Sequence, residues 1–260
     1  MKKMFLVLIL ALPLASWARP AFVNITEDEF EDVAKGLASN FTHNSMMGAS
    51  KLGTIFGFQV GVVGAQTAVP KIDDIAERNG TDLKNLYNAG LMGAVGIPFG
   101  LSFEAVVMPT FKADDVKAEN TSFAVKLNIN EVIPILPVNL ALRGFQSNAE
   151  LSFKQTIAST EATVSNQTTV TGVQLLLSPM LPIVEPYVGV GYLNAENELE
   201  VSNTTGTVFG YTTAQKDKET ISGTQFLVGA EVSLLLIKLG AEYSQAFGNS
   251  RYGVKLAIGF

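Results

Sequence analysis

The chain has 260 residues, of which 47% are hydrophobic and 16% charged, with a formal net charge of −6 and no cysteine. Soluble domains usually carry about 25% charged residues, so this composition is apolar for a soluble protein. The lack of cysteine excludes disulfides, zinc–thiolate sites and a thiol nucleophile, and the acidic balance argues against a nucleic-acid partner.

The first 18 residues have the pattern of a secretory signal. Lys2 and Lys3 form a positive start, an apolar run follows from Phe5 to Leu14, and Ser16 and Ala18 supply the small residues of a cleavage site. The apolar run is shorter than the roughly 20 residues of a spanning helix, which disfavours an uncleaved anchor. We therefore expect export, with cleavage after Ala18.

Residues 19–52 precede the first predicted strand. Thr26 and Glu29 have the spacing of a capping box. Apolar residues then recur on one helical face at Phe30, Val33, Ala34, Leu37 and Phe41. The pattern predicts a helix near 26–40, which lies in the periplasm or plugs the barrel.

From residue 53 to residue 260 the apolar positions recur with a period of two. Such segments lie near 56–62, 91–97, 101–107, 123–129, 138–143, 173–177, 188–192, 226–232, 237–243 and 252–260. The opposite face carries Gly, Ala, Ser and isolated charges, which suit a barrel lumen better than a sandwich core. The sequence predicts an all-β fold: an antiparallel transmembrane β-barrel of about ten strands, within a range of about 8 to 12, with a short N-terminal helix.

The predicted connections alternate in kind. Short links fall at 98–100, 132–137, 179–184 and 234–236, and longer polar links at 67–87, 112–120, 155–168 and 196–222. Transmembrane barrels have short periplasmic turns and longer outside loops, so we expect the short links and both chain ends on the periplasmic side. Residues 144–168 fit either a bulged strand or an additional turn, and the second interpretation leads to twelve strands.

The last nine residues form an apolar strand pattern that begins with an aromatic residue and ends in phenylalanine. Its key positions are Tyr252, Gly253, Leu256, Ile258 and Phe260. This pattern resembles the C-terminal assembly signal of bacterial outer-membrane barrels, and the resemblance implies recognition by the barrel assembly machinery. Outer-membrane lipid and that machinery are the predicted partners, and the outer membrane is the predicted location.

The mature chain also resembles an uncharacterised family of bacterial outer-membrane β-barrel proteins, distantly like fatty-acid transport channels. The resemblance is carried by Asn44 to Gly64, where small residues lead into an aromatic-rich strand, and by the Pro-bounded turn from Glu131 to Val138. The fatty-acid channels are longer and have more strands, so their substrate is not carried over.

Seven charged residues occupy predicted inward-facing positions: Glu104, Lys126, Arg143, Glu231, Lys238, Glu242 and Lys255. Buried charges have to be paired, and this set is nearly balanced. They either line a weakly basic pore or form salt bridges that close a narrow barrel. Inward glycines such as Gly57, Gly96 and Gly253 leave volume for water, an apolar ligand or the N-terminal helix.

The single histidine, His43, lies before the first strand, away from the predicted outside loops. Because hydrolytic barrels generally use a histidine base, we do not expect an enzyme, and we identify no cofactor or metal motif. The leading functional hypothesis is porin-like passage of small or apolar molecules across the outer membrane. The alternative is a closed structural or surface-interaction barrel whose outside loops, above all 196–222, carry the function.

Overall fold

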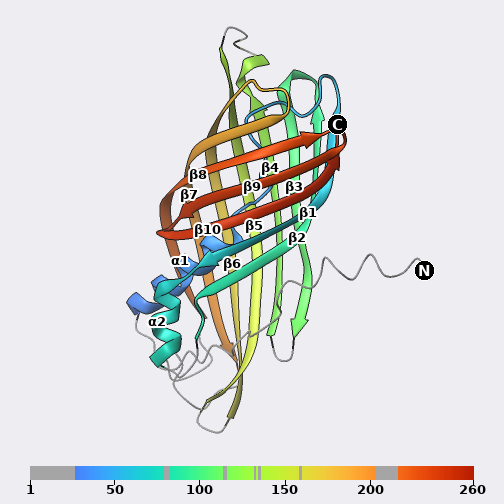
Figure 1. Ribbon diagram of the computed structural model, residues 1–260. Helices are drawn as coiled ribbons and strands as arrows, with labels where there is room; N and C mark the ends of the chain where they lie inside the picture. Colours follow the sequence, from blue (N-terminus) through green and yellow to red (C-terminus); the bar gives the residue numbers. More distant parts are fainter. Residues whose placement is uncertain are drawn as a thin grey trace, which may run out of the picture.

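The computed structural model describes residues 27–78, 82–113, 116–131, 133, 136–157, 160–202 and 216–260. The expected signal peptide, its cleavage site and Thr26 lie outside these residues. Ten antiparallel strands form a closed barrel in the order β1-β10-β9-β8-β7-β6-β5-β4-β3-β2 (Figure 1). The predicted fold class is confirmed, and the described residues form ten strands.

The strands are β1 (Gly57–Ala68), β2 (Asn85–Ile97), β3 (Leu101–Ala113), β4 (Val116–Asn128), β5 (Val138–Ile157), β6 (Thr160–Pro179), β7 (Val184–Ser202), β8 (Lys216–Leu234), β9 (Ile237–Ala246) and β10 (Asn249–Gly259). The other described elements are the helices α1 (Glu27–Phe41) and α2 (Pro70–Arg78) and the short 3-10 turns η1 (Pro98–Gly100) and η2 (Ile129–Glu131). The predicted N-terminal helix is therefore confirmed as α1.

The outer surface of the barrel changes from apolar to polar along the strands. On β7, Val188, Val190 and Tyr192 face outward and are exposed, whereas the next outward residues are Asn194 and Glu196. Similar changes occur from Phe123 to Thr121, from Val173 to Thr171 and from Phe226 to Thr224. The apolar part has the character of a lipid-facing band, and the polar part continues beyond it.

The longest strands, β5 to β8, continue beyond the apolar band for about half of their length. We call their polar-faced parts, residues 146–157, 160–171, 194–202 and 216–224, the extension. The expectation of long polar loops is therefore wrong in part. Most residues of the links expected at 112–120, 155–168 and 196–222 belong to strands β3 to β8. The stretch from residue 144 to Ile157 is a continuous part of β5, so the additional turn considered there is wrong.

The extension stays paired because its inner face has a core of its own. Along α1, Phe30, Val33, Leu37 and Phe41 form one buried cluster with residues of the barrel wall and of α2. The wall and α2 residues of this cluster include Ile72, Ile75, Phe153, Val164 and Leu199. The strands can thus continue beyond the apolar band because their inward apolar residues are buried against α1.

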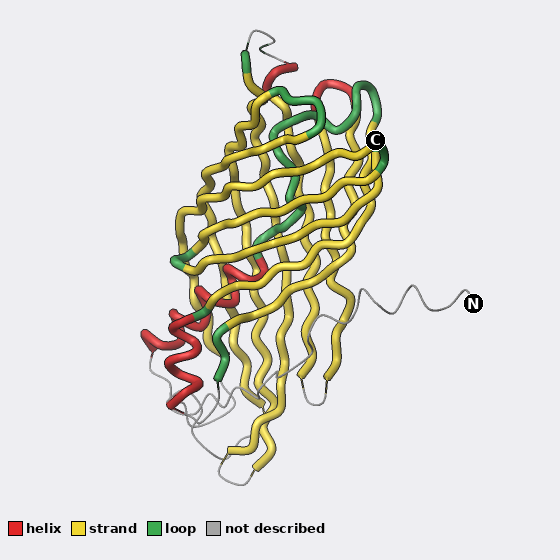
Figure 2. Tube along the Cα trace, in the orientation of Figure 1, coloured by secondary structure: helices red, strands yellow, loops and turns green. Residues whose placement is uncertain are grey.

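The chain between α1 and β1 runs lengthwise through the barrel. Figure 2 shows it leaving the helix and passing inside the wall to the mouth where the C-terminus lies. We call this the closing mouth, because β1 and β10 complete the barrel there: Phe58 and Phe260 each donate their backbone N–H to the other's carbonyl at 3.0 Å. The opposite mouth, where α1 and α2 lie, is the extended end (Figure 1).

Closure depends on close backbone contact between β1 and β10. A side chain at Gly61 would place its Cβ 2.3 Å from the carbonyl oxygen of Leu256, whereas a Cβ at Gly64 on the same strand meets nothing within 4 Å. We expect Gly61→Val to lower the free energy of unfolding by about 3 kcal/mol or to block assembly, because overpacking at a backbone contact cannot relax. Heat-modifiable gel migration of refolded protein measures the folded fraction.

Gly64→Val is the matched control and should fold like the wild type. Equal folded fractions for the two variants would show that the close contact at Gly61 does not limit closure.

Candidate functional site

The lumen is occupied by residues 39–52, which we call the plug segment. Every residue from 36 to 49 is buried. Beyond Phe41 the segment is neither helix nor strand, so its backbone carbonyls have no regular hydrogen-bond partners. Buried carbonyls need such partners, and here the barrel wall has to supply them.

Cationic side chains of the wall donate to the plug carbonyls over the whole length of the segment. Arg251 reaches the Thr42 carbonyl at 2.7 Å and Lys255 reaches the Met46 carbonyl at 2.6 Å. Lys126 donates to the carbonyls of Gly48 at 2.7 Å and Ser50 at 3.1 Å. Hydrogen bonds from charged donors are stronger than neutral ones, so these three residues fix the path of the plug.

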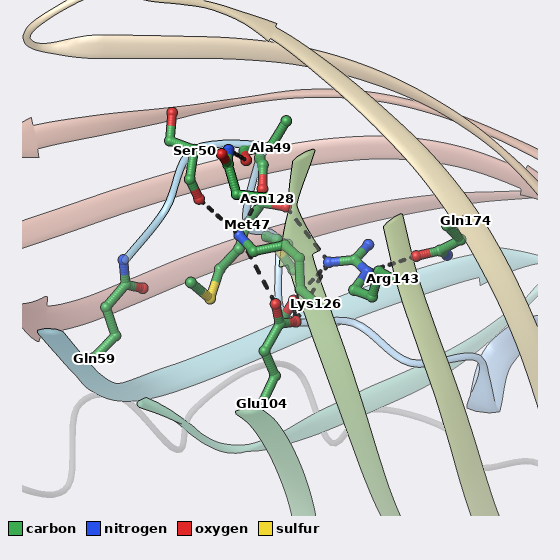
Figure 3. Close-up of polar contacts among 12 residues, drawn as sticks. Met47, Ala49, Ser50, Gln59, Glu104, Lys126, Asn128, Arg143 and Gln174 are labelled. Carbon is green, nitrogen blue, oxygen red and sulfur yellow. Dashed lines mark hydrogen bonds and ion pairs between the residues drawn. The ribbon is translucent and has the colours of Figure 1, made fainter. Parts of the chain in front are cut away.

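Neutral wall side chains bind the carbonyls that the cations leave. Asn88 donates to Asn40 at 3.1 Å, Ser147 to Phe41 at 2.5 Å and Asn128 to Ala49 at 2.7 Å. Figure 3 shows Asn128, Lys126 and Arg143 converging on the part of the plug that contains Met47, Ala49 and Ser50. The plug is therefore held by donors from several strands rather than by one partner strand.

Glu104 is the acid at the centre of the network. It accepts hydrogen bonds from Ser45 at 2.6 Å, from His43 at 3.2 Å and from Arg143 at 3.4 Å, and Lys126 lies at 4.0 Å. Two of these partners belong to the plug and two to the wall. The carboxylate thus joins the plug side chains to the cations that hold the plug backbone.

Two further acids balance the cations of β10. Glu231 pairs with Lys255 and accepts from Gln59 at 3.2 Å. Glu242 accepts from the Tyr187 hydroxyl at 3.0 Å and lies 3.9 Å from Arg251. Each buried cation that holds the plug therefore has an acid within ion-pair distance, as a buried charge requires.

Six of the seven charged residues predicted to face inward are buried in the structure: Glu104, Lys126, Arg143, Glu231, Glu242 and Lys255. Lys238 lies at the closing mouth with its side chain 16% exposed, 3.8 Å from Glu231. The six buried residues are linked to one another by contacts with the plug, and they do not line an open lumen.

Sequence reasoning missed Arg251 and Glu185. Arg251 donates to three plug carbonyls, and Glu185 accepts the backbone N–H of Ser50 at 2.8 Å. Arg251 has the inward parity of Lys255, and Glu185 has that of Gly189. Both precede the alternating segments recognised in the sequence, so extending those segments by a few residues would have revealed them.

His43 joins a hydroxyl and a carboxylate. Its Nδ1 lies 2.9 Å from Ser122 Oγ, its Nε2 lies 3.2 Å from Glu104, and its ring stacks on Phe145 with centroids 5.7 Å apart. Burial lowers the pKa of His43, and the hydrogen bond to Glu104 opposes that shift. The arrangement resembles a serine–histidine–acid relay; all three groups are fully buried, and their contacts join the plug to strands β3 and β4.

A cavity of about 180 Å³ opens at the closing mouth, between the plug and strands β7 to β9. Its polar lining includes Ser50, Lys126, Glu185, Glu231 and Lys238. Ser122 is not part of this lining. Plug residues, among them Met47, Gly48 and Leu52, line one side of this cavity, which we call the vestibule.

Within the part of the chain that the structure describes, no cluster of three or more His, Asp or Glu side chains is placed to hold a metal ion. None of the described helices is long and apolar enough to span a membrane.

The chain belongs to a protein family described as a family of unknown function (DUF6588), whose model matches residues 19–258. This agrees with the expected resemblance to an uncharacterised barrel family. No curated protein matches the chain significantly.

Solved structures similar to the chain include three barrels. The outer membrane protease OmpT from Escherichia coli has 10% identity, a TM-score of 0.44 and coverage of 81% of this chain and 97% of that chain. The translocator domain of autotransporter NalP from Neisseria meningitidis has 11% identity, a TM-score of 0.45 and coverage of 90% and 95%, respectively. The toluene transporter TbuX from Ralstonia pickettii has 9% identity, a TM-score of 0.26 and coverage of 85% and 92%.

The role of the wall cations is testable on β4, which carries one buried and one partly exposed lysine. Lys126→Met leaves the carbonyls of Gly48 and Ser50 without their donor and removes a cation from beside Glu104. We expect the free energy of unfolding to fall by about 3 kcal/mol, because a buried network loses one charge. Urea titration followed by gel migration measures the change.

The control is Lys117→Met, whose lysine is 33% exposed and pairs with Glu150 at 3.1 Å. A surface pair contributes less than about 1 kcal/mol, so this variant should unfold near the wild-type midpoint. Similar losses for both lysines would contradict the assigned role of Lys126.

Proposed function

We propose that the protein is a bacterial outer-membrane barrel closed at rest by its plug segment, and that small or apolar molecules pass when the plug is displaced. The outward apolar band, which gives way to Thr, Asn and Glu on β4 and β6 to β8, supports the membrane location. The observation that carries the passage proposal is that wall ions bind the backbone of a separate segment.

This arrangement differs from a barrel sealed by its own side chains. In a sealed barrel the wall charges bind only one another, whereas Lys126, Arg251 and Lys255 pair with wall acids and also donate to plug carbonyls. Displacing the plug leaves these cations and their acids facing an emptied, water-wettable lumen. The vestibule at the closing mouth is the place where a molecule from the periplasm first meets the plug.

The alternative function, a closed surface-interaction barrel, is favoured by the extension. Its outward residues are polar, among them Thr169, Thr171, Asn194 and Glu196, and its inner face is packed on α1. A rigid polar wall of this kind is suited to bind other molecules outside the membrane. In that case the plug is a permanent core, and no condition opens it.

A hydrolytic role is not part of the proposal. Ser122, His43 and Glu104 are each at most 2% exposed, and His43 belongs to the plug, so opening the lumen takes the base away from the hydroxyl. We expect purified protein to show no ester hydrolysis above the level of a His43→Ala variant. A hydrolysis rate that this substitution abolished would instead establish an enzyme.

The proposed partners follow from the last strand. Tyr252, Leu256, Ile258 and Phe260 face outward and are exposed, as lipid contact requires. Gly253 faces inward, and a Cβ there would lie 2.5 Å from Met46 Cε. The residues proposed as an assembly signal thus also meet the needs of the finished barrel, with membrane lipid on one face and the plug on the other.

Conductance in a planar bilayer tests the passage proposal. A Cβ at Gly48 would lie 2.3 Å from the Glu185 carboxylate oxygen that accepts the Ser50 N–H, so Gly48→Leu displaces Glu185 and removes this hydrogen bond between wall and plug. We expect wild-type protein to remain closed and Gly48→Leu to open in discrete steps. Gly144→Leu is the control, because a Cβ at Gly144 meets nothing within 4 Å and that residue lies on the outward face.

A variant lacking residues 19–50 completes the comparison, with heat-modifiable migration as the check that each barrel is folded. Steps in the truncated and Gly48→Leu proteins alone support a displaceable plug. Folded barrels without steps in any of the four proteins contradict passage of ions and favour the surface-interaction barrel.

A further inference from the structure

The direction in which the plug is threaded is fixed by contacts at its two ends. Near its start, Ser39 Oγ donates at 2.7 Å to the carbonyl of Ala246, the last residue of β9. Near its finish, Lys51 pairs at 2.7 Å with Glu131 in η2, the turn between β4 and β5. These two turns lie at opposite ends of the barrel, so the chain enters at the extended end and reaches the closing mouth only at β1 (Figure 2).

The two longest connections indicate which end faces outward. At the closing mouth, β2 joins β3 through three residues and β8 joins β9 through Leu235 and Leu236. The other two links at the closing mouth, between β4 and β5 and between β6 and β7, have nine and four residues. The two longest links of the barrel lie at the extended end, from Ala68 to Asn85 with α2 and from Ser202 to Lys216, and the other three links there have two residues each. Short turns on the periplasmic side and longer loops outside are the rule for these barrels.

The surfaces of the two ends agree with this assignment. Apolar residues continue into the turns of the closing mouth, where Phe99 is 82% and Leu235 97% exposed, as at the edge of a lipid layer. The extended end instead carries polar outward residues on four strands far beyond the apolar band. That end stands in water, clear of the membrane.

The start of α1 is held at the extended end by α2. Glu29 pairs with Arg78, Phe30 and Val33 share a buried cluster with Ile75, and a Cβ at Gly36 would lie 2.5 Å from Ile72. Asp28 is exposed. The helix therefore begins at the rim of the extension with its polar side toward solvent, and only its later turns lie in the lumen.

We propose that the chain enters the lumen from the outer surface, so that the start of α1 at Asp28 is held there, in place of the periplasmic position expected from the sequence. Because the chain runs through the lumen, the charged start of α1 reaches this end without contact with lipid. The proposal rests on the outer-membrane location proposed above but is independent of passage, since a permanently closed plug holds the start of α1 there equally well.

Cysteine labelling tests the topology, because the chain contains no native cysteine. Three single variants are made in the full chain: Asp28→Cys at the start of α1, Thr220→Cys on the extension and Glu131→Cys at the closing mouth. Each replaced residue is exposed. Cells are treated with a membrane-impermeant maleimide before and after the outer membrane is permeabilised.

We expect Asp28→Cys and Thr220→Cys to label equally well in intact and permeabilised cells, and Glu131→Cys to label only after permeabilisation. Labelling of Asp28→Cys only after permeabilisation would overturn the proposal. Labelling of Thr220→Cys only after permeabilisation would overturn it as well, because the barrel would be inserted the other way round. A failure to conduct in the bilayer experiment leaves this labelling pattern unchanged.

A cross-link shows whether the labelled molecules have the helix in the lumen. Ser39 on α1 and Asn249 on β10 are neighbours joined by a hydrogen bond of 3.2 Å, so cysteines at these two positions are chosen for an oxidative cross-link between the two elements. We expect the oxidised Ser39→Cys/Asn249→Cys protein, with Asp28→Cys present, to label at Asp28→Cys in intact cells. Cross-linked molecules that label only after permeabilisation would show a periplasmic helix start.

Discussion

The structure depends on satisfying the carbonyls of an extended chain inside a closed barrel. Secondary structure normally provides these hydrogen bonds, but beyond Phe41 the plug segment has neither a helix nor a partner strand. Leaving a buried carbonyl unpaired costs roughly 1–3 kcal/mol, so a row of them requires a row of donors. Arg251, Lys255, Lys126 and Asn128 supply that row, and their placement on several strands fixes where the plug runs.

The acids of the lumen and its glycines are consequences of the same requirement. Cations placed to bind carbonyls need counter-charges, which Glu104, Glu231 and Glu242 provide. The plug also needs space between the walls. Met46 adopts a positive φ of 50°, and its side chain lies where a Cβ at Gly253 would be. Inward glycines therefore mark the space that the plug takes, which a row of larger side chains would have closed.

The extension shows how a helix from one part of the chain changes the extent of strands in another. The outward faces of β5 to β8 beyond the apolar band are as polar as loops, and the sequence therefore suggested loops there. Their inward residues, such as Phe153, Val164 and Leu199, are apolar and pack on α1. The same helix, held at the extended end, gives the plug its direction through the barrel.

The sequence by itself determined the class of fold, the helix ahead of it and the inward position of charges such as Glu104, Lys126 and Arg143. These features follow from local periodicity, because a strand with lipid outside and a polar lumen inside alternates with a period of two. The partners of those charges were decided only by the tertiary structure. Whether Lys126 binds an acid across the lumen or the carbonyl of Gly48 depends on residues 78 positions apart meeting in space. Periodicity reports which way a side chain points, whereas the path of an irregular chain through the lumen depends on contacts that no local pattern encodes.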